Sequence, residues 1–116
     1  MMKALNFYSS VYHGILVVRD KRCTIRLGDK RDKYQEGELI WVTHGNRFHP
    51  RQKVFTAVID RVTVKKVSEL TPEDLSGENP DMKTPAAAAT FLKSIYGREI
   101  ELSDQVTVVY FSEVMD

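Results

Sequence analysis

The sequence predicts an α+β fold, a small mixed β-barrel of about five strands with two or three helices packed against it. Strand-like and helix-like segments follow one another in mixed order, without the regular alternation that a doubly wound parallel sheet requires. In residues 54–67 the apolar positions change parity near Asp60 and Arg61. A shift of this kind is typical of a β-bulge or a barrel corner, where a long strand coils strongly.

Five segments have the residue pattern of strands: 3–7, 22–27, 38–43, 54–67 and 105–114. The third and the fifth carry apolar residues at both parities, which predicts that both of their faces are covered. In the third, Leu39 and Trp41 are expected on one face and Ile40 and Val42 on the other. Residues 28–37 and 44–53 are polar and contain glycine, so we expect a loop and a hairpin loop.

Three helical segments are expected. Ser9 or Ser10 can cap a first helix that ends near residues 19–20. Thr71 and Pro72 begin a short helical turn that ends at Gly77. Thr84-Pro85 repeats the start signal before a longer helix, which Gly97 stops and whose core-facing stripe is Ala88, Phe91, Leu92 and Ile95.

Length and composition indicate one domain spanning residues 1–116. The hydrophobic fraction of 42% and the charged fraction of 28% are ordinary for a globular protein, which argues against disorder or a coiled coil. No apolar run approaches the roughly 20 residues that a membrane span needs, and the first residues lack the apolar segment of a signal peptide. We therefore expect a soluble, cytoplasmic protein that does not contact membranes.

Cysteine and histidine usage argues against a metal site. The single cysteine, Cys23, excludes an internal disulfide and cannot alone build a zinc site, so it is interpreted as a small buried hydrophobe. His44 and His49 lie in the hairpin loop without nearby acidic or thiolate residues. No metal and no other cofactor is expected.

The charge distribution hints at an anionic partner. The net charge is only +1, but residues 1–66 hold 14 basic and 6 acidic residues, whereas residues 67–116 hold 3 basic and 10 acidic ones. The halves therefore carry +8 and −7. A basic first half would suit a polyanion, unless folding brings the two halves together and cancels the charges.

The strand at 22–27 has two chemically different faces. Alternation sends Cys23, Ile25 and Leu27 to one side and Arg22, Thr24 and Arg26 to the other, with Lys21 at the entrance of the strand. Two guanidinium groups around a hydroxyl suit an anionic or carbonyl-bearing ligand. The alternative is an ordinary solvated strand face, on which Arg and Thr are common.

A nucleic-acid-binding surface is one hypothesis that these patterns support. The hairpin loop combines an arginine with an aromatic residue and a histidine, as base stacking beside a phosphate contact requires. The alternative is a solvated turn with Phe48 folded inward. In the binding hypothesis, phosphate contacts come from Lys21, Arg22, Arg26, Lys30, Arg31 and Arg47, and stacking comes from Tyr34, Phe48 or His49.

The segment Lys21-Arg22-Cys23-Thr24-Ile25-Arg26 resembles the GxKxxTxR signature of the ASCH (activating signal cointegrator homology) domain, a branch of the PUA-like superfamily. Lys21, Thr24 and Arg26 match the motif, while Arg19 stands where its glycine is expected. The resemblance extends from Leu5 to about Phe111 and includes the "LTPEDLSGEN" segment. It is greatest to small bacterial single-domain proteins.

This resemblance implies a PUA-like barrel with a cleft beside the motif that holds RNA or a modified nucleoside. Some relatives are acetylcytidine amidohydrolases, in which the residues matching Thr24, Lys21 and Glu78 act as nucleophile, base and third member of a triad. Lysine can act as a base only if its pKa is lowered by burial or by nearby cations. Ribonuclease activity, with His44 and His49 as acid and base, is a weaker alternative. The oligomeric state is not predicted.

Overall fold

The computed structural model describes residues 2–7, 21–45 and 50–115. Its secondary structure comprises strands β1 (Lys3–Phe7), β2 (Cys23–Leu27), β3 (Leu39–His44), β4 (Gln52–Lys66) and β5 (Gln105–Glu113), a 3-10 turn η1 (Val67–Glu69), and helices α2 (Pro72–Glu78) and α3 (Pro85–Tyr96). The five expected strands and the two later helices are thus confirmed. The expected first helix lies outside the described residues.

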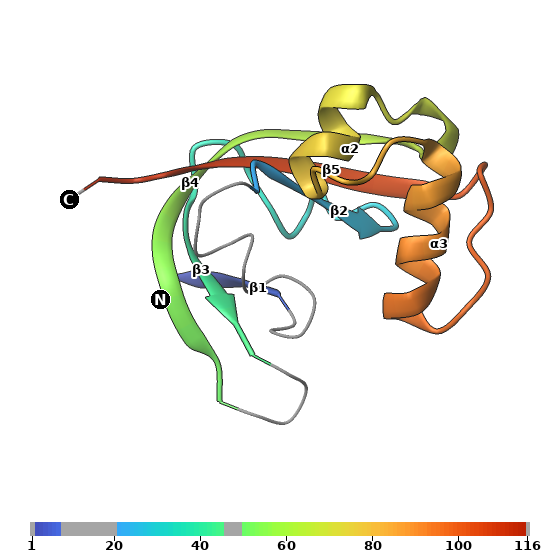
Figure 1. The fold of residues 1–116 in the computed structure, drawn as a ribbon. Coiled ribbons are helices and arrows are strands. Elements are labelled where there is room, and N and C mark those ends of the chain that lie inside the picture. Colours follow the sequence, from blue (N-terminus) through green and yellow to red (C-terminus); the bar gives the residue numbers. More distant parts are fainter. Residues whose placement is uncertain (1, 8–20, 46–49, 116) are drawn as a thin grey trace.

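The strands form one mixed sheet in the order β1-β3-β4-β5-β2. β1 and β3 are parallel, and the other neighbouring pairs are antiparallel. Figure 1 shows the sheet curling into a half-barrel, with α2 and α3 packed beside β2 and β5. The curl matters for the site, because the first and last strands of the sheet, β1 and β2, lie on either side of its open seam.

The expected irregularity in β4 is present. β4 is 15 residues long, and its pairing with β5 shifts register between Ile59 and Arg61, so Asp60 is the extra residue. A bulge bends the strand and increases its twist. β4 can therefore pair with β3 before the bulge and with β5 along most of its length, which curls the sheet.

Apolar side chains form two clusters. One lies inside the curled sheet and includes Leu5, Ile40, Ile59 and Phe111. The other lies between β2, β5 and the helices, and includes Ile25, Leu75, Leu92 and Val108. β5 contributes to both clusters from alternate residues, which confirms that its two faces are covered.

The prediction for β3 was wrong on one face. Leu39 and Trp41 are 47% and 41% exposed, whereas Ile40 and Val42 are fully buried. No helix of the described chain covers the outer side of β3, because α2 and α3 lie on the β2 and β5 side of the sheet (Figure 1). The pattern of apolar residues could not reveal which strand the helices would cover.

The helix ends follow the expected local signals. Thr71 caps α2 by accepting a hydrogen bond from the N–H of Asp74, and Thr84 caps α3 in the same way through Ala87. Gly97 ends α3 in the left-handed conformation at φ 71°. α2 continues one residue beyond the expected end at Gly77, which places Glu78 inside the helix rather than in irregular chain.

The charges of the two halves of the sequence meet in the fold. Lys21 pairs with Glu78, Arg61 with Glu73, and Lys65 with Asp74. Each pair joins a basic residue of the first half to an acid of the second. The charge asymmetry of the sequence is thus partly cancelled on folding.

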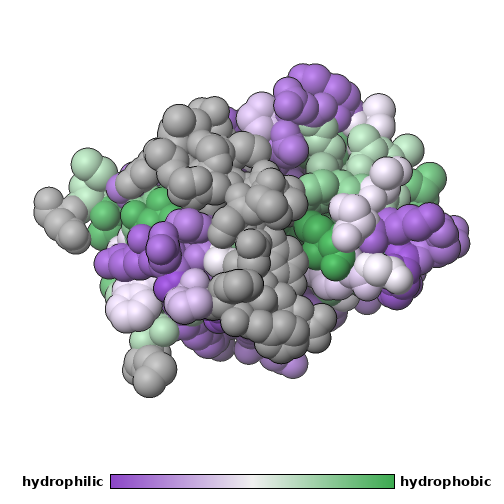
Figure 2. All heavy atoms as spheres, turned by 60° about the horizontal axis from the view of Figure 1, so that its bottom comes forward, coloured by the Kyte–Doolittle hydropathy of each residue, from purple (hydrophilic) through white to green (hydrophobic). Residues whose placement is uncertain are grey.

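Hydrophobic side chains come to the surface in two separate places in Figure 2, one on the side of α3 and one near the C-terminus. Tyr96 at the end of α3 and Met115 are among the exposed large apolar residues. Within the described residues, no helix is both long and apolar enough to cross a membrane.

Close packing of α2 on β2 predicts an unusual glycine effect. A Cβ atom at Gly77 would lie 2.8 Å from the Sγ of Cys23. We expect Gly77→Ala to destabilise the protein by about 1–3 kcal/mol, because the clash outweighs the better helix propensity of alanine. In a Cys23→Ala background the same change should be neutral or stabilising by up to about 1 kcal/mol. Urea unfolding of the four proteins in this double-mutant cycle measures the difference, and equal effects in both backgrounds would contradict the packing described.

Candidate functional site at the seam between β1 and β2

A buried ion pair lies where α2 meets β2. The Nζ atom of Lys21 is 2.6 Å from Oε1 of Glu78 and donates a second hydrogen bond of 2.8 Å to the main-chain oxygen of the same residue. The side chains are 1% and 0% exposed. Lys21 lies two residues before β2 and Glu78 is the last residue of α2, so the fold brings together two residues that are 57 positions apart.

The second carboxylate oxygen of Glu78 holds the backbone of β2. Oε2 accepts a 2.6 Å hydrogen bond from the N–H of Ile25. Because β2 is an edge strand, this N–H points away from β5 and needs a partner. Glu78 therefore fixes the main chain beside Thr24 while it neutralises Lys21.

Burial sets the electrostatics of this pair. It lowers the pKa of Lys21, because a low-dielectric surrounding disfavours the ammonium ion. The charge of Glu78 and its hydrogen bond raise this pKa without cancelling the effect of burial, and the charge of Arg26 lowers it further. A lysine of this kind is closer to acting as a base than a lysine in water.

Thr24 and Arg26 extend the cluster across the seam. Thr24 is 1% exposed, and its Oγ1 accepts a 2.9 Å hydrogen bond from Nε of Arg26. Nη2 of Arg26 donates to the main-chain oxygen of Asn6 at 3.2 Å. One guanidinium group thus connects β2 with β1.

Both cations lie close to one aromatic ring. Nζ of Lys21 lies 5.0 Å and Cζ of Arg26 lies 4.9 Å from the ring centre of Phe7. A cation at this distance is attracted to the π face. This role of Phe7 was not predicted, because the alternation of Leu5 and Phe7 in the strand at 3–7 indicates core packing alone. We call Phe7, Lys21, Thr24, Arg26 and Glu78 the seam cluster.

The other described residues that were predicted to bind nucleic acid lie outside the seam cluster and differ in exposure. Arg22 and Lys30 are exposed, and Arg31 is exposed but paired with Asp29 at 2.6 Å. Tyr34 is 4% exposed and packs in the core, so its ring cannot stack a base in this conformation. Arg47, Phe48 and His49 lie outside the described residues.

The ribonuclease hypothesis requires His44 and His49 to face each other, and the structure describes only His44. His44 ends β3 and is half-buried, whereas His49 lies outside the described residues. Among the described residues, no group of three or more His, Cys, Asp or Glu side chains is placed to hold a metal ion.

A second polar cluster is centred on buried Asp74, one helical turn before Glu78 in α2. Asp74 accepts hydrogen bonds from the Tyr110 hydroxyl at 2.6 Å and from Nζ of Lys65 at 2.8 Å. Burial opposes ionisation of Asp74, but these hydrogen bonds and one from the N–H of Thr71 lower its pKa.

Burial raises the pKa of Cys23 to about 12. Cys23 thus remains an unreactive thiol at neutral pH, as its interpretation as a buried hydrophobe requires.

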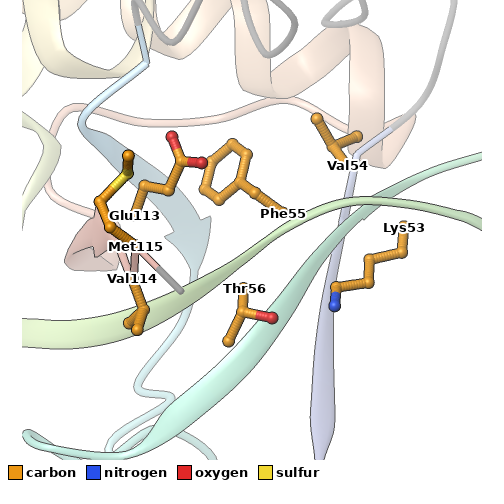
Figure 3. Close-up of a pocket in the computed structure, with 7 residues that line it drawn as sticks. All are labelled: Lys53, Val54, Phe55, Thr56, Glu113, Val114 and Met115. Carbon is orange, nitrogen blue, oxygen red and sulfur yellow. The ribbon is translucent and has the colours of Figure 1, made fainter.

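A pocket of about 380 Å³ lies apart from the seam cluster, between the start of β4 and the end of β5. Figure 3 shows its lining residues: Lys53, Val54, Phe55, Thr56, Glu113, Val114 and Met115. None of them belongs to the seam cluster.

Comparison with solved structures shows the fold. An ASCH domain from Lactobacillus crispatus aligns with 96% of this chain and 79% of its own, at 13% identity and a TM-score of 0.67. A hypothetical protein aligns with 98% of this chain and 100% of its own, at 14% identity and a TM-score of 0.67. A protein from Enterococcus faecalis aligns with 98% of this chain and 81% of its own, at 14% identity and a TM-score of 0.70. No protein-family model and no curated protein sequence matches this chain.

The buried pair predicts a strong energetic coupling. Lys21→Met leaves the Glu78 carboxylate without its cation, and Glu78→Gln leaves the Lys21 ammonium without its anion. Each change should lower the free energy of unfolding by roughly 3–5 kcal/mol. The double variant should lose clearly less than the sum of the two, because neither charge then remains buried alone. Additive losses in urea unfolding would show that the two charges do not stabilise each other.

Proposed function

Because the chain has the PUA-like fold of an ASCH domain, we propose that it binds RNA or a modified nucleoside at the seam between β1 and β2. The observation that carries this proposal is the state of Arg26. Its guanidinium group is half-buried and is held by Thr24 Oγ1, the Asn6 carbonyl and the Phe7 ring. Among the described carboxylates, none forms an ion pair with it.

A guanidinium group held in this way is preorganised for an anion or a carbonyl. Arginine has five N–H donors in a planar fork, and the contacts to Thr24 and Asn6 occupy two of them. Arg22 has the same parity in the strand as Arg26 and is exposed, so it can add a phosphate contact. Lys21 lies beneath the exposed surface, where its buried ammonium is paired with Glu78.

A second candidate function is hydrolysis of an acylated cytidine. Two observations favour it. Lys21 Nζ lies 2.6 Å from Glu78 Oε1, and the same carboxylate binds the N–H of Ile25, the residue after Thr24. In addition, the pKa of Lys21 is lowered. In this reaction the Thr24 hydroxyl attacks the amide carbonyl carbon, and Lys21, in the neutral amine form that its lowered pKa favours, takes the hydroxyl proton. The amide C–N bond breaks, the cytidine amine leaves with a proton, and water then hydrolyses the acyl ester of Thr24. Arg26, which donates to Thr24 Oγ1, can stabilise negative charge that develops there.

The binding proposal predicts a specific salt dependence. We expect a fluorescently labelled single-stranded RNA to bind with an affinity that falls as salt rises, with a slope of roughly −0.7 per neutralised phosphate. Arg26→Gln should weaken binding about tenfold or more and reduce the slope by about 0.7. Fluorescence anisotropy over a series of salt concentrations measures both quantities.

Arg98→Gln is the matched control, because Arg98 follows α3 and belongs to neither β1 nor β2. It removes the same charge away from the seam and should change neither affinity nor slope. The proposal would be wrong if both variants weakened RNA binding equally, since general charge attraction would then explain it.

The enzyme candidate predicts turnover of a neutral N4-acylated cytidine with little effect of salt. Thr24→Val and Lys21→Met should each reduce the rate at least about 100-fold, while Thr24→Ser, which keeps a hydroxyl, should retain part of it. The acidic limb of the pH–rate profile should report a lysine pKa below its ordinary value. Chromatography of the released cytidine measures the rate. Wild-type protein that leaves the substrate intact at high enzyme concentration would remove this candidate and leave the binding proposal standing.

A further inference from the structure

Trp41 is an exposed aromatic residue on the outer side of the sheet. It is the single tryptophan of the chain and is 41% exposed on the outer side of β3. Its neighbours in register are Ala4 on β1 and Thr56 on β4. Both are small, so little covers the indole from the adjoining strands.

The charged side chains in the sequence segment that contains Trp41 are all basic. Nζ of Lys53 lies 5.6 Å from the centre of the Trp41 ring. Residues 39–59, which include all of β3 and the first half of β4, contain Arg47, Arg51 and Lys53 but no Asp or Glu. An aromatic face beside the Lys53 ammonium is suited to a nucleobase with its phosphate.

Two neighbours of the exposed indole line the pocket of Figure 3. These neighbours are Lys53 and Thr56. The ammonium of Lys53 lies near the Trp41 ring, and Thr56 is opposite Trp41 in the pairing of β3 with β4. Glu113 supplies the one carboxylate of the lining. Because two neighbours of Trp41 line this hollow of about 380 Å³, it offers space near a base stacked on the indole.

We propose that Trp41 and Lys53 form a second contact site for single-stranded nucleic acid, with an unpaired base stacked on Trp41 and its phosphate near Lys53. This inference rests on the proposed function and adds to it a binding face outside the seam. The two places are linked through β1. Thr43 has the same parity as Trp41 in β3 and donates to Asn6 Oδ1 at 2.8 Å, and the Asn6 main-chain oxygen contacts Arg26.

The experiment uses the intrinsic fluorescence of the protein, which reports Trp41 because the chain has one tryptophan. Titration with a short oligouridylate should quench this fluorescence with the same midpoint as the anisotropy of the labelled oligonucleotide. Trp41→Ala should raise the Kd about 5- to 150-fold, as expected for the loss of one stacked base, and Trp41→Phe should raise it less. Lys53→Gln should reduce the salt slope by about 0.7.

Leu39→Ala is the matched control on the same strand, because Leu39 is 47% exposed and has the same parity as Trp41. It should leave the Kd unchanged, and circular dichroism should show that every variant folds. Binding that depends on Arg26 but not on Trp41, without quenching, would overturn this inference and leave the proposed function intact. Absence of any binding would overturn both. Dimerisation through this face, detected by sedimentation and abolished by Trp41→Ala, would also overturn it, because the indole would then be occupied by a second copy of the chain.

Discussion

The ion pair between Lys21 and Glu78 is the interaction on which the site depends. Both side chains are almost completely removed from water, and a buried charge without a partner destabilises a protein strongly. One carboxylate oxygen of Glu78 pairs with the ammonium of Lys21, and the other accepts a hydrogen bond from the N–H of Ile25. The pair thereby attaches the end of α2 to the start of β2. Thr24 and Arg26 take their positions from a strand that this attachment holds in place.

The curvature of the sheet is the second requirement. The bulge at Asp60 bends β4, so the sheet coils and its first and last strands approach each other at the seam. Arg26 then reaches the main chain of β1 with a side chain, although β1 and β2 share no ladder of backbone hydrogen bonds. A flatter sheet would separate Phe7 from the two cations that it contacts.

Much of this fold could be predicted because its signals are local. Thr71-Pro72 and Thr84-Pro85 mark helix starts, Gly97 marks a helix end, and the parity change near Asp60 marks the bulge. The motif residues Lys21, Thr24 and Arg26, with Glu78, were identified through a family resemblance. By contrast, the burial of Tyr34 and the exposure of Trp41 depend on which faces other elements cover. No residue pattern within one strand or one loop contains that information.

The same limit applies to the polar contacts. The hydrogen bond between Tyr110 and Asp74 joins residues 36 positions apart, and the contact of Phe7 with Lys21 needs β1 and the start of β2 to be adjacent. Phe7 also satisfies every expectation for an ordinary core residue, since it is 2% exposed. Its second role as a surface for cations follows only from the three-dimensional arrangement.

The way the outer edge of β2 is completed has a consequence for the behaviour of the molecule in concentrated solution. Two alternate residues of β2 point their N–H groups outward. The N–H of Ile25 donates to the Glu78 carboxylate at 2.6 Å, and the N–H of Leu27 donates to the Tyr96 hydroxyl at 3.2 Å. Edge strands with unoccupied N–H groups can recruit strands from other molecules and nucleate aggregates. Here side chains from two helices occupy those groups, so intermolecular strand addition at this border must first displace α2 and α3.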